Sequence, residues 1–314
     1  MSTGTSEWAI ETHGLTKKFG NNVAVDGVDL LIPRGTAFGY LGPNGAGKTT
    51  LIRTLLGLTR ADAGTMSLLG YDVPKHRDRA LARVGAIVDE PRFHGHLSGR
   101  QNLQILAAAR EPAARGRIDA ALERVGILQR ANDRVSKYSM GMRQRLGVAA
   151  CLIGDPQLLI LDEPMNGLDP AGMHEMRDMI RALVDEGRTV VLSSHLLDEV
   201  QRTCDALAIV DHGRVIQQGS IDTLLAGGSV VLKVECSDPS QAVTLLTQQS
   251  IGGTVTVAGD ELAITLPPET SRDVFAEIAR VLTAHNIAIY RLEPVKTSLE
   301  AWFLQVTSRL GDPQ

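Results

Sequence analysis

One stretch of this 314-residue chain places glycines, a lysine and a hydroxyl at a spacing that suits phosphate binding. It consists of Gly42, Pro43, Asn44, Gly45, Ala46, Gly47, Lys48 and Thr49, with Thr50 directly after it. The stretch matches the pattern G-x-x-x-x-G-K-[ST] at every required position. Its glycines let backbone N–H groups converge on phosphate oxygens, Lys48 adds a positive charge, and the Thr49 hydroxyl is a ligand for Mg²⁺. We interpret this stretch as a nucleoside triphosphate site rather than an ordinary glycine-rich turn.

Two acidic residues follow a second apolar segment, 158–161, which reads as a strand covered on both faces. The first, Asp162, is predicted to hold Mg²⁺ directly or through water. The second, Glu163, is predicted to polarise a water for attack on the γ-phosphate. His195 ends the next predicted strand and is a candidate contact of the γ-phosphate; otherwise it would be a plain polar residue at a strand end.

Other positions allow a chemical and a purely structural interpretation, and the residues alone leave the choice open. Asp89, after the predicted strand 84–88, would bind Mg²⁺ or orient water, or belong to a solvated turn. Phe19 would stack on adenine or pack in the core. Ser139 and Gly141 precede a predicted helix, where they would form an anion site or simply cap the helix.

An α/β fold must position these residues. The hydrophobic pattern predicts short strands, a helix directly after the phosphate loop and a helix over 171–186. Residues 99–134 are rich in Ala, Leu, Arg and Glu at helical spacing, so we predict a helical insertion within a subdomain of about residues 92–153. The first domain is then expected to cover residues 1–226.

Residues 227–314 are predicted to form a second domain, after a hinge at Gly227 and Gly228. Their strand and helix patterns follow the order βαββαβ, which indicates a small ferredoxin-like α+β fold. A last predicted helix over 298–306 carries an apolar stripe, which is typical of a core or dimer contact. We hypothesise that this domain regulates the protein or stabilises a dimer.

Composition limits the possible classes of protein. The formal net charge is −4, which does not suit a strongly basic nucleic-acid binder. The apolar runs are far shorter than the roughly 20 residues needed to cross a bilayer, and we recognise no secretory signal at the N-terminus. The three cysteines are odd in number and lack C-x-x-C spacing, so we expect reduced, packed thiols and a cytosolic location. His94 and His96 have no third ligand nearby, so no zinc site is predicted.

The order and spacing of the phosphate loop, residues 138–145, 158–163 and 165–170, and His195 resemble those of ATP-binding cassette (ABC) transporter ATPase subunits. The resemblance covers about residues 9–222. It implies that the substrate is ATP with Mg²⁺, that Phe19 contacts adenine and that Glu163 is the catalytic base. It also implies that Ser139 and Gly141 form the family signature, that Asp169 belongs to a dimer-contact loop, and that His195 acts as a switch.

The chain departs from the usual family motifs in two places. The signature reads Ser-Met-Gly-Met where Ser-Gly-Gly-Gln is usual, and Asp89 replaces a Gln. This version resembles the bacterial antibiotic and multidrug exporter branch. The resemblance implies a separate transmembrane permease, gripped by the helical insertion on the inner face of the membrane. It also implies a head-to-tail homodimer in which Lys48 of one chain and Ser139 of the other close on the same ATP.

Two other classes of protein fit these residues less well. A soluble ABC ATPase that acts on nucleic acid or ribosomes is disfavoured, because such proteins separate the cassette halves by a long coiled coil or carry two cassettes. We therefore expect no nucleic-acid partner. A phosphate-loop kinase outside the family would have no use for the region around Ser139.

Overall fold

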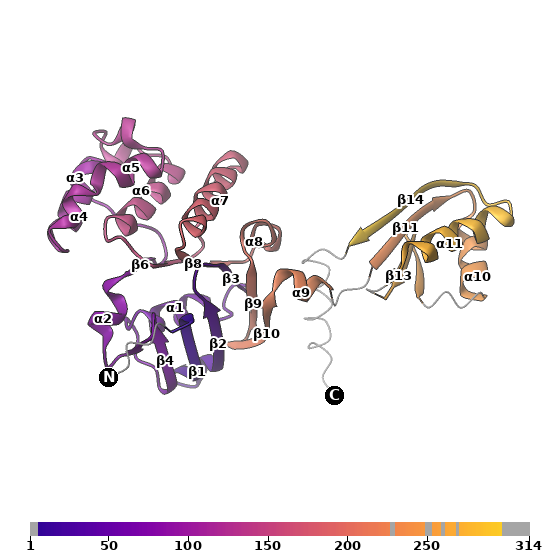
Figure 1. The fold of residues 1–314 in the computed structure, drawn as a ribbon, viewed down its shortest axis with the longest axis horizontal. Coiled ribbons are helices and arrows are strands. Elements are labelled where there is room, and N and C mark those ends of the chain that lie inside the picture. Colours follow the sequence, from indigo (N-terminus) through magenta and orange to yellow (C-terminus); the bar gives the residue numbers. More distant parts are fainter. Residues whose placement is uncertain (1–5, 227–229, 249–252, 259–260, 268–269, 297–314) are drawn as a thin grey trace. The chain divides into compact units, whose positions relative to one another are not determined.

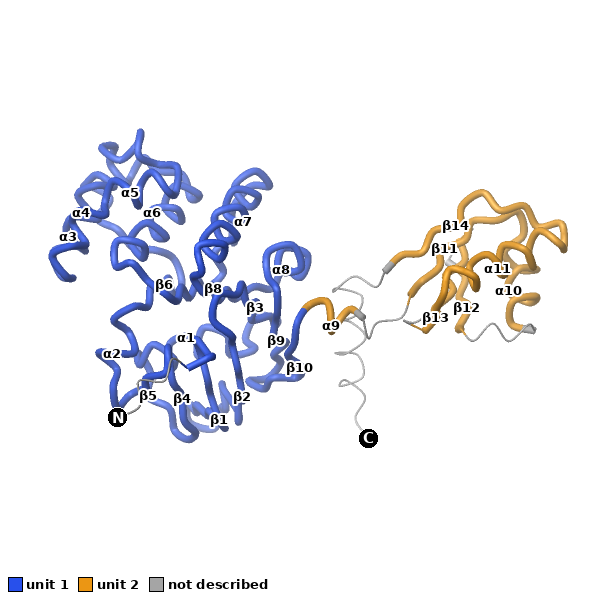
Figure 2. Tube along the Cα trace, viewed as in Figure 1, with its two compact units in different colours: residues 1–220 blue, residues 221–314 orange. Residues whose placement is uncertain are grey.

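The structure is a computed structural model that describes residues 6–226, 230–248, 253–258, 261–267 and 270–296. The chain forms two compact units, residues 1–220 and 221–314 (Figure 2). This division lies a few residues before the predicted boundary at residue 226. The predicted hinge at Gly227 and Gly228 and the predicted helix over 298–306 lie outside the described residues.

The first unit contains a six-stranded sheet that carries most of the predicted site residues. Its strand order is β10-β9-β3-β8-β7-β6, and only the β9–β10 pair is antiparallel. Every residue of β3, β7 and β8 is buried, as expected for parallel strands covered on both faces. The strands are β3 (Ala37–Leu41), β6 (Val84–Ile87), β7 (Leu158–Leu161), β8 (Thr189–Ser194), β9 (Ala206–Asp211) and β10 (Arg214–Ser220).

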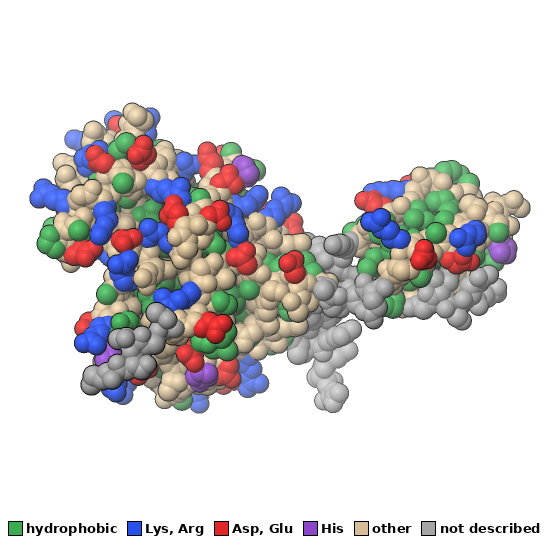
Figure 3. Space-filling model, in the orientation of Figure 1, with side chains coloured by type: hydrophobic (Ala, Val, Ile, Leu, Met, Phe, Trp, Pro, Cys, Tyr) green, Lys and Arg blue, Asp and Glu red, His purple; other side chains and the backbone are tan. Residues whose placement is uncertain are grey.

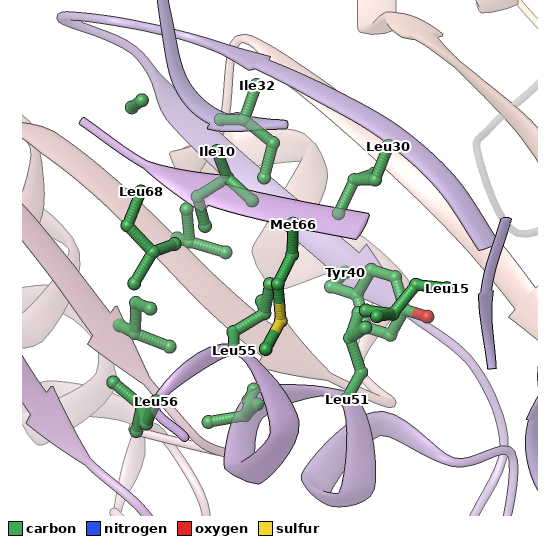
Figure 4. Close-up of a cluster of buried hydrophobic side chains, with 14 of the residues drawn as sticks. Ile10, Leu15, Leu30, Ile32, Tyr40, Leu51, Leu55, Leu56, Met66 and Leu68 are labelled. Atoms are coloured by element: carbon green, nitrogen blue, oxygen red, sulfur yellow. The ribbon is translucent and has the colours of Figure 1, made fainter. Parts of the chain in front are cut away.

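A second, antiparallel sheet has the order β2-β1-β4-β5. Its strands are β1 (Trp8–Phe19), β2 (Asn22–Pro33), β4 (Ala63–Leu68) and β5 (Tyr71–Val73). Helix α1 (Lys48–Leu55) presents Leu51 and Leu55 to this sheet, where they pack in one apolar cluster with Leu15 and Met66 (Figure 4). Because these side chains are buried, the core anchors α1 and the phosphate loop that precedes it.

The predicted helical insertion consists of short helices, which Figure 1 shows grouped together in magenta. They are α3 (Gly99–Ala108), α4 (Ala113–Gly116), α5 (Ile118–Arg124) and α6 (Met140–Leu152), with 3₁₀ turns at Leu128–Arg130 and Val135–Lys137. Helix α3 begins at a capping box in which Ser98 and Gln101 bond to each other's backbone N–H. The remaining helices of the first unit are α2 (Arg77–Ala82), α7 (Pro170–Asp185) and α8 (Leu197–Thr203).

The second unit has the predicted βαββαβ order after a short helix, α9 (Ile221–Ala226). Its antiparallel sheet has the order β12-β13-β11-β14, so β13 lies between β11 and β12 in the split arrangement of ferredoxin-like folds. Apolar side chains of this sheet and of α10 and α11 form a separate core. The elements are β11 (Val230–Cys236), α10 (Pro239–Gln248), β12 (Thr254–Ala258), β13 (Glu261–Leu266), α11 (Arg272–Ala284) and β14 (Ile289–Lys296).

The helix after the phosphate loop begins earlier than the sequence pattern predicts. It starts at Lys48 rather than Thr50, because Gly47 adopts a left-handed conformation and the chain turns into the helix directly after it. Helices α8 and α9 and strand β5 are too short to give a clear periodic pattern, and they were not predicted. In the part of the chain that the structure describes, every helix is too short or too polar to span a lipid bilayer.

Candidate active site

The phosphate loop joins the carboxyl end of β3 to the N-terminus of α1. Gly47 has a φ of 97°, and an added Cβ there would lie 2.1 Å from the carbonyl oxygen of Ala24. A Cβ on Gly42 would lie 2.4 Å from the carbonyl oxygen of Val210. Only glycine fits these two positions. No side chain caps α1, so its first N–H groups are available to an anion.

Lys48 folds back over the loop and is only 6% exposed. Its Nζ donates hydrogen bonds to the carbonyl oxygens of Gly42, at 2.7 Å, and Pro43, at 3.3 Å. It also lies 3.3 Å from Oε1 of Glu163. A buried ammonium group needs such partners, and a phosphate bound in the loop would be a stronger one than a neutral carbonyl.

A hydroxyl on each side holds the carboxylate of Asp162, which is 4% exposed at the end of β7. Thr49 Oγ1 donates to Asp162 Oδ2 at 2.8 Å, and Ser193 Oγ donates to Oδ1 at 2.5 Å. Ser193 also accepts a hydrogen bond from the backbone N–H of Glu163 at 2.9 Å. The sequence interpretation gave Ser193 no role, since its only signal was its position at the end of β8.

Glu163 is turned towards two other predicted site residues. Its φ of 48° is left-handed, a conformation that costs a non-glycine residue about 1–3 kcal/mol. In this conformation, Oε1 faces Lys48 and Oε2 lies 2.9 Å from Nδ1 of His195. The structure therefore brings Lys48, Glu163 and His195 together, although they come from three separate parts of the sequence.

A cleft of about 430 Å³ runs from the phosphate loop to Phe19. Phe19 is 53% exposed, so it is not a core residue, and Lys17 Nζ lies 5.1 Å from the centre of its ring. Lys48, Thr49, Thr50 and Glu163 line the inner part of the same cleft. The exposed ring and the phosphate loop thus offer an apolar surface and an anion site within one cleft. His212 and Gly213 also line it, and the sequence interpretation assigned them only to a turn.

A second pocket, of about 310 Å³, adjoins the cleft, because Thr49 and Glu163 line both. Asp89 lines this second pocket together with Asp162. Its carboxylate, however, is bonded to Arg53 of α1 at 2.5 Å. The structure therefore brings Asp89 to the predicted site, but gives its carboxylate a partner that the sequence interpretation did not foresee.

Three predicted site residues, Ser139, Gly141 and Asp169, do not line the cleft that contains Lys48. Ser139 is exposed and caps α6 by accepting a hydrogen bond from the N–H of Met142 at 3.2 Å. Asp169 is exposed and caps α7 by accepting from the N–H of Gly172 at 2.9 Å. Neither of these residues, nor Gly141, is among the described residues that line the cleft between Phe19 and Lys48.

Comparison with known proteins gives consistent results. A model of the ABC transporter family matches residues 25–166. The uncharacterized ABC transporter ATP-binding protein YhcH of Bacillus subtilis is 37% identical, over 95% of this chain and 95% of its own length. The daunorubicin resistance ATP-binding protein DrrA3 of Streptomyces coeruleorubidus is 38% identical over 96% of each chain. The solved structure of cbiO1 from Clostridium perfringens, described as part of the ABC transporter complex cbiONQ, is 27% identical, with a TM-score of 0.65 over 70% of this chain and 92% of that one.

Proposed function

Because the chain belongs to the family of ABC transporter ATP-binding proteins, whose members bind and hydrolyse ATP, we propose that it is the ATPase subunit of an exporter. The exported compound would be a drug, an antibiotic or a lipid-like molecule. The observation that carries the proposal is the cleft that joins Phe19, the phosphate loop and Glu163. The export of a drug is supported by the likeness to a daunorubicin resistance protein over nearly the whole chain.

The residues of the cleft would have different roles in binding and hydrolysing ATP. The adenine ring would stack on the exposed ring of Phe19, while the loop N–H groups and Lys48 hold the phosphates. Glu163 would accept a proton from the attacking water, and the hydrogen bond between Glu163 and His195 would keep its carboxylate turned towards the phosphates. Lys48 Nζ lies 3.3 Å from the same carboxylate, so the phosphate-binding lysine and the proposed base are next to each other.

The oxygen atoms beside the loop fit Mg²⁺, because a hydroxyl and a buried carboxylate lie 2.8 Å apart there. Thr49 and Asp162 would hold the ion. When bound, Mg²⁺ would neutralise the charge that develops on the phosphates. Ser193 keeps the Asp162 carboxylate in place for this role. Asp89 would act at the edge of the site, where Arg53 holds it.

Two copies of the chain would form a head-to-tail homodimer with composite ATP sites. Support comes from Ser139, which is exposed at the N-terminus of α6 but does not line the cleft of its own chain. The N-terminus of a helix favours an anion, and the exposed Ser139 could contact the phosphates bound to a second copy. Each site would then need Lys48 from one chain and Ser139 from the other.

A separate permease would supply the membrane-spanning part, with this chain at the inner face of the membrane. The related cbiO1 is described as part of a transporter complex. A groove of about 540 Å³ between β6 and helices α3 and α6 contains Phe93, Leu106 and Arg110, and suits a helix with apolar and acidic side chains. This groove is the proposed permease contact of the helical insertion.

The test of the ATPase assignment is Glu163→Gln. This change removes the base and leaves the phosphate loop intact, so we expect ATP binding to persist while turnover falls about 100-fold or more. A dimer should accumulate with ATP, as measured by size-exclusion chromatography. Glu186→Gln is a matched control at an exposed position on the surface, and it should leave the rate unchanged. Normal turnover in Glu163→Gln would overturn the role of Glu163.

The test of the exporter assignment is to purify the chain from gently solubilised membranes and identify what accompanies it. A multi-span membrane protein would support the proposal, whereas ribosomal or DNA-associated proteins without one would favour the soluble alternative. On the face that Figure 3 shows, Lys and Arg side chains of the first unit are intermixed with Asp and Glu, unlike the basic stripe of a nucleic-acid binder. We therefore expect little salt-dependent binding to DNA or RNA.

A further inference from the structure

The exposed ring of Phe19 carries a cation on one of its faces. Lys17 Nζ lies over this ring, 5.1 Å from its centre, and a cation within about 6 Å of a ring centre is attracted to the ring. Both residues belong to the end of β1, where they are two positions apart and so share a face of the strand. The proposed binding of ATP uses the ring of Phe19 but gives Lys17 no role.

Lys17 is itself held by Asp62, which directly precedes β4. Lys17 Nζ lies 3.1 Å from Oδ2 of Asp62, and the same oxygen accepts a hydrogen bond from the backbone N–H of Lys18 at 2.6 Å. The N–H of Asp62 donates to the carbonyl oxygen of Thr16 at 2.8 Å, which ties this residue to β1. The Lys18 N–H and the Lys17 ammonium hold the pKa of Asp62 below its usual range, so Asp62 is a negative partner at neutral pH.

The pairing of β1 with β2 restrains the ring only weakly. The register between these strands shifts between Leu15 and Lys17 and again between Lys17 and Lys18, and Phe19 is the last residue of β1. A ring that is 53% exposed also has little packing around it to select one rotamer. A cation that is fixed beside the ring by Asp62 therefore supplies a restraint that the sheet does not.

We propose that Lys17 is a positioning residue, which orders the ring of Phe19 so that an adenine base stacks on the opposite face. The inference rests on the proposed ATPase function and deepens it, because it assigns part of the affinity for the base to a residue outside the cleft. Lys17 is not among the described residues that line the cleft, so it acts through the ring. A ring that is ordered before binding loses less conformational freedom when the base stacks on it.

The test compares two ligands of the full chain, ATP and inorganic triphosphate, each with Mg²⁺, by isothermal titration calorimetry. Lys17→Met removes the cation and keeps a long side chain. We expect the Kd of ATP to rise about threefold, because the ring loses the cation. The Kd of inorganic triphosphate should stay the same, because this ligand has no base. Asp62 is 44% exposed, so the loss of its partner should change the melting temperature little.

Two further variants serve as controls for Lys17→Met. Lys17→Arg keeps a cation beside the ring, so it should bind ATP like the unmodified chain. Lys18→Met removes the same charge from the neighbouring, exposed position and should leave the Kd of both ligands unchanged. In a Phe19→Ala background, Lys17→Met should no longer alter the Kd of ATP, because the ring through which Lys17 acts is absent.

Three results would overturn the inference. One is an unchanged Kd of ATP in Lys17→Met. Another is an equal rise in the Kd of ATP and of inorganic triphosphate, which would indicate a general effect of charge or folding. The third is an equal effect of Lys17→Met with and without the ring of Phe19. The same titrations separate this inference from the proposed function. If the unmodified chain binds ATP and Lys17→Met binds it equally well, only the role of Lys17 is wrong. If the unmodified chain does not bind ATP, the proposed function itself is wrong.

Discussion

At the scale of single residues, one hydroxyl organises the acidic pair of the active site. Ser193 Oγ donates to Asp162 and accepts from the backbone N–H of Glu163, so it joins the end of β8 to the end of β7. Ser193 therefore contacts both acidic residues at once, in addition to the bond from Thr49 to Asp162 and the contacts of Glu163 with Lys48 and His195. A small polar residue at the end of a buried strand thus helps to position two site residues, a role that its sequence context does not indicate.

We predict that Ser193→Ala weakens both folding and catalysis. It leaves the Glu163 N–H and one Asp162 oxygen without this partner, at a cost of about 1–3 kcal/mol in unfolding free energy. Denaturant unfolding and steady-state ATP hydrolysis would measure the two effects. Ser194→Ala is the control, because Ser194 is also buried, and among the described residues its side chain bonds to the nearby Leu196 N–H rather than to either acidic residue. Equal behaviour of the two variants would contradict the role of Ser193.

The Arg53–Asp89 ion pair also belongs to this scale. Both side chains are about half exposed, so the pair adds little to stability. Its effect is to occupy a carboxylate next to Thr49 and Asp162, and so to limit the crowding of negative charge there. A Gln at this position would carry no charge and would need no such partner.

At the scale of elements, the helix N-termini of the first unit fall into two kinds. Helices α3, α6 and α7 are capped by the side chains of Ser98, Ser139 and Asp169, whereas α1, α2, α4, α5 and α8 begin without a side-chain cap. The uncapped N–H groups of α1 are those that face the phosphate site. A capping side chain there would compete with the ligand for the same donors.

The cap of α7 gives a prediction that separates stability from association. Asp169→Ala should destabilise the protein by about 1 kcal/mol, because the Gly172 N–H loses its acceptor. Asn caps a helix about as well as Asp, so Asp169→Asn should unfold like the unmodified protein. If Asp169 also contacts the second copy, ATP-dependent dimerisation of the Asn variant would be weaker at unchanged stability. Thermal unfolding and sedimentation would measure the two properties. A clear loss of stability in the Asn variant would be evidence against the cap as the source of the effect.

At the scale of the whole molecule, each unit has its own core. One apolar cluster joins α1 to the two sheets of the first unit, and another fills the second unit. Buried thiols lie in both units, Cys151 and Cys204 in the first and Cys236 in the second. All three are free, which agrees with the expectation of reduced, packed thiols.

These thiols should be inert in the folded protein. Burial raises the pKa of Cys151 to about 12 and also raises the pKa of Cys204 and Cys236, so little reactive thiolate forms at pH 8. We expect a thiol reagent to react with the protein only as it unfolds. Unfolding returns the thiol pKa values to about 8.5. The thiols therefore contribute their full stabilisation of the folded state below that pH, and the free energy of unfolding should fall as the pH rises above it. Reaction of the folded protein at the rate of a small thiol would contradict this picture.

The sequence by itself determined several features whose residues lie close together in the chain. The phosphate loop, the acidic pair after a buried strand and the βαββαβ order of the second unit all follow from local patterns of glycine, charge and apolar spacing. Such patterns also showed the order of motifs that resembles one family. They could not place short helices such as α8, whose few residues show no clear period.

Only the tertiary structure decided which distant side chains meet. It exposed Phe19 at the end of a cleft, bonded Asp89 to Arg53, and left Ser139 outside the cleft that contains Lys48. It also placed Gln144, to which the sequence interpretation gave no individual role, in the lining of the same pocket as Glu163. The reason is physical: burial and hydrogen bonding depend on how strands and helices pack, and residues far apart in the chain become neighbours only when they do.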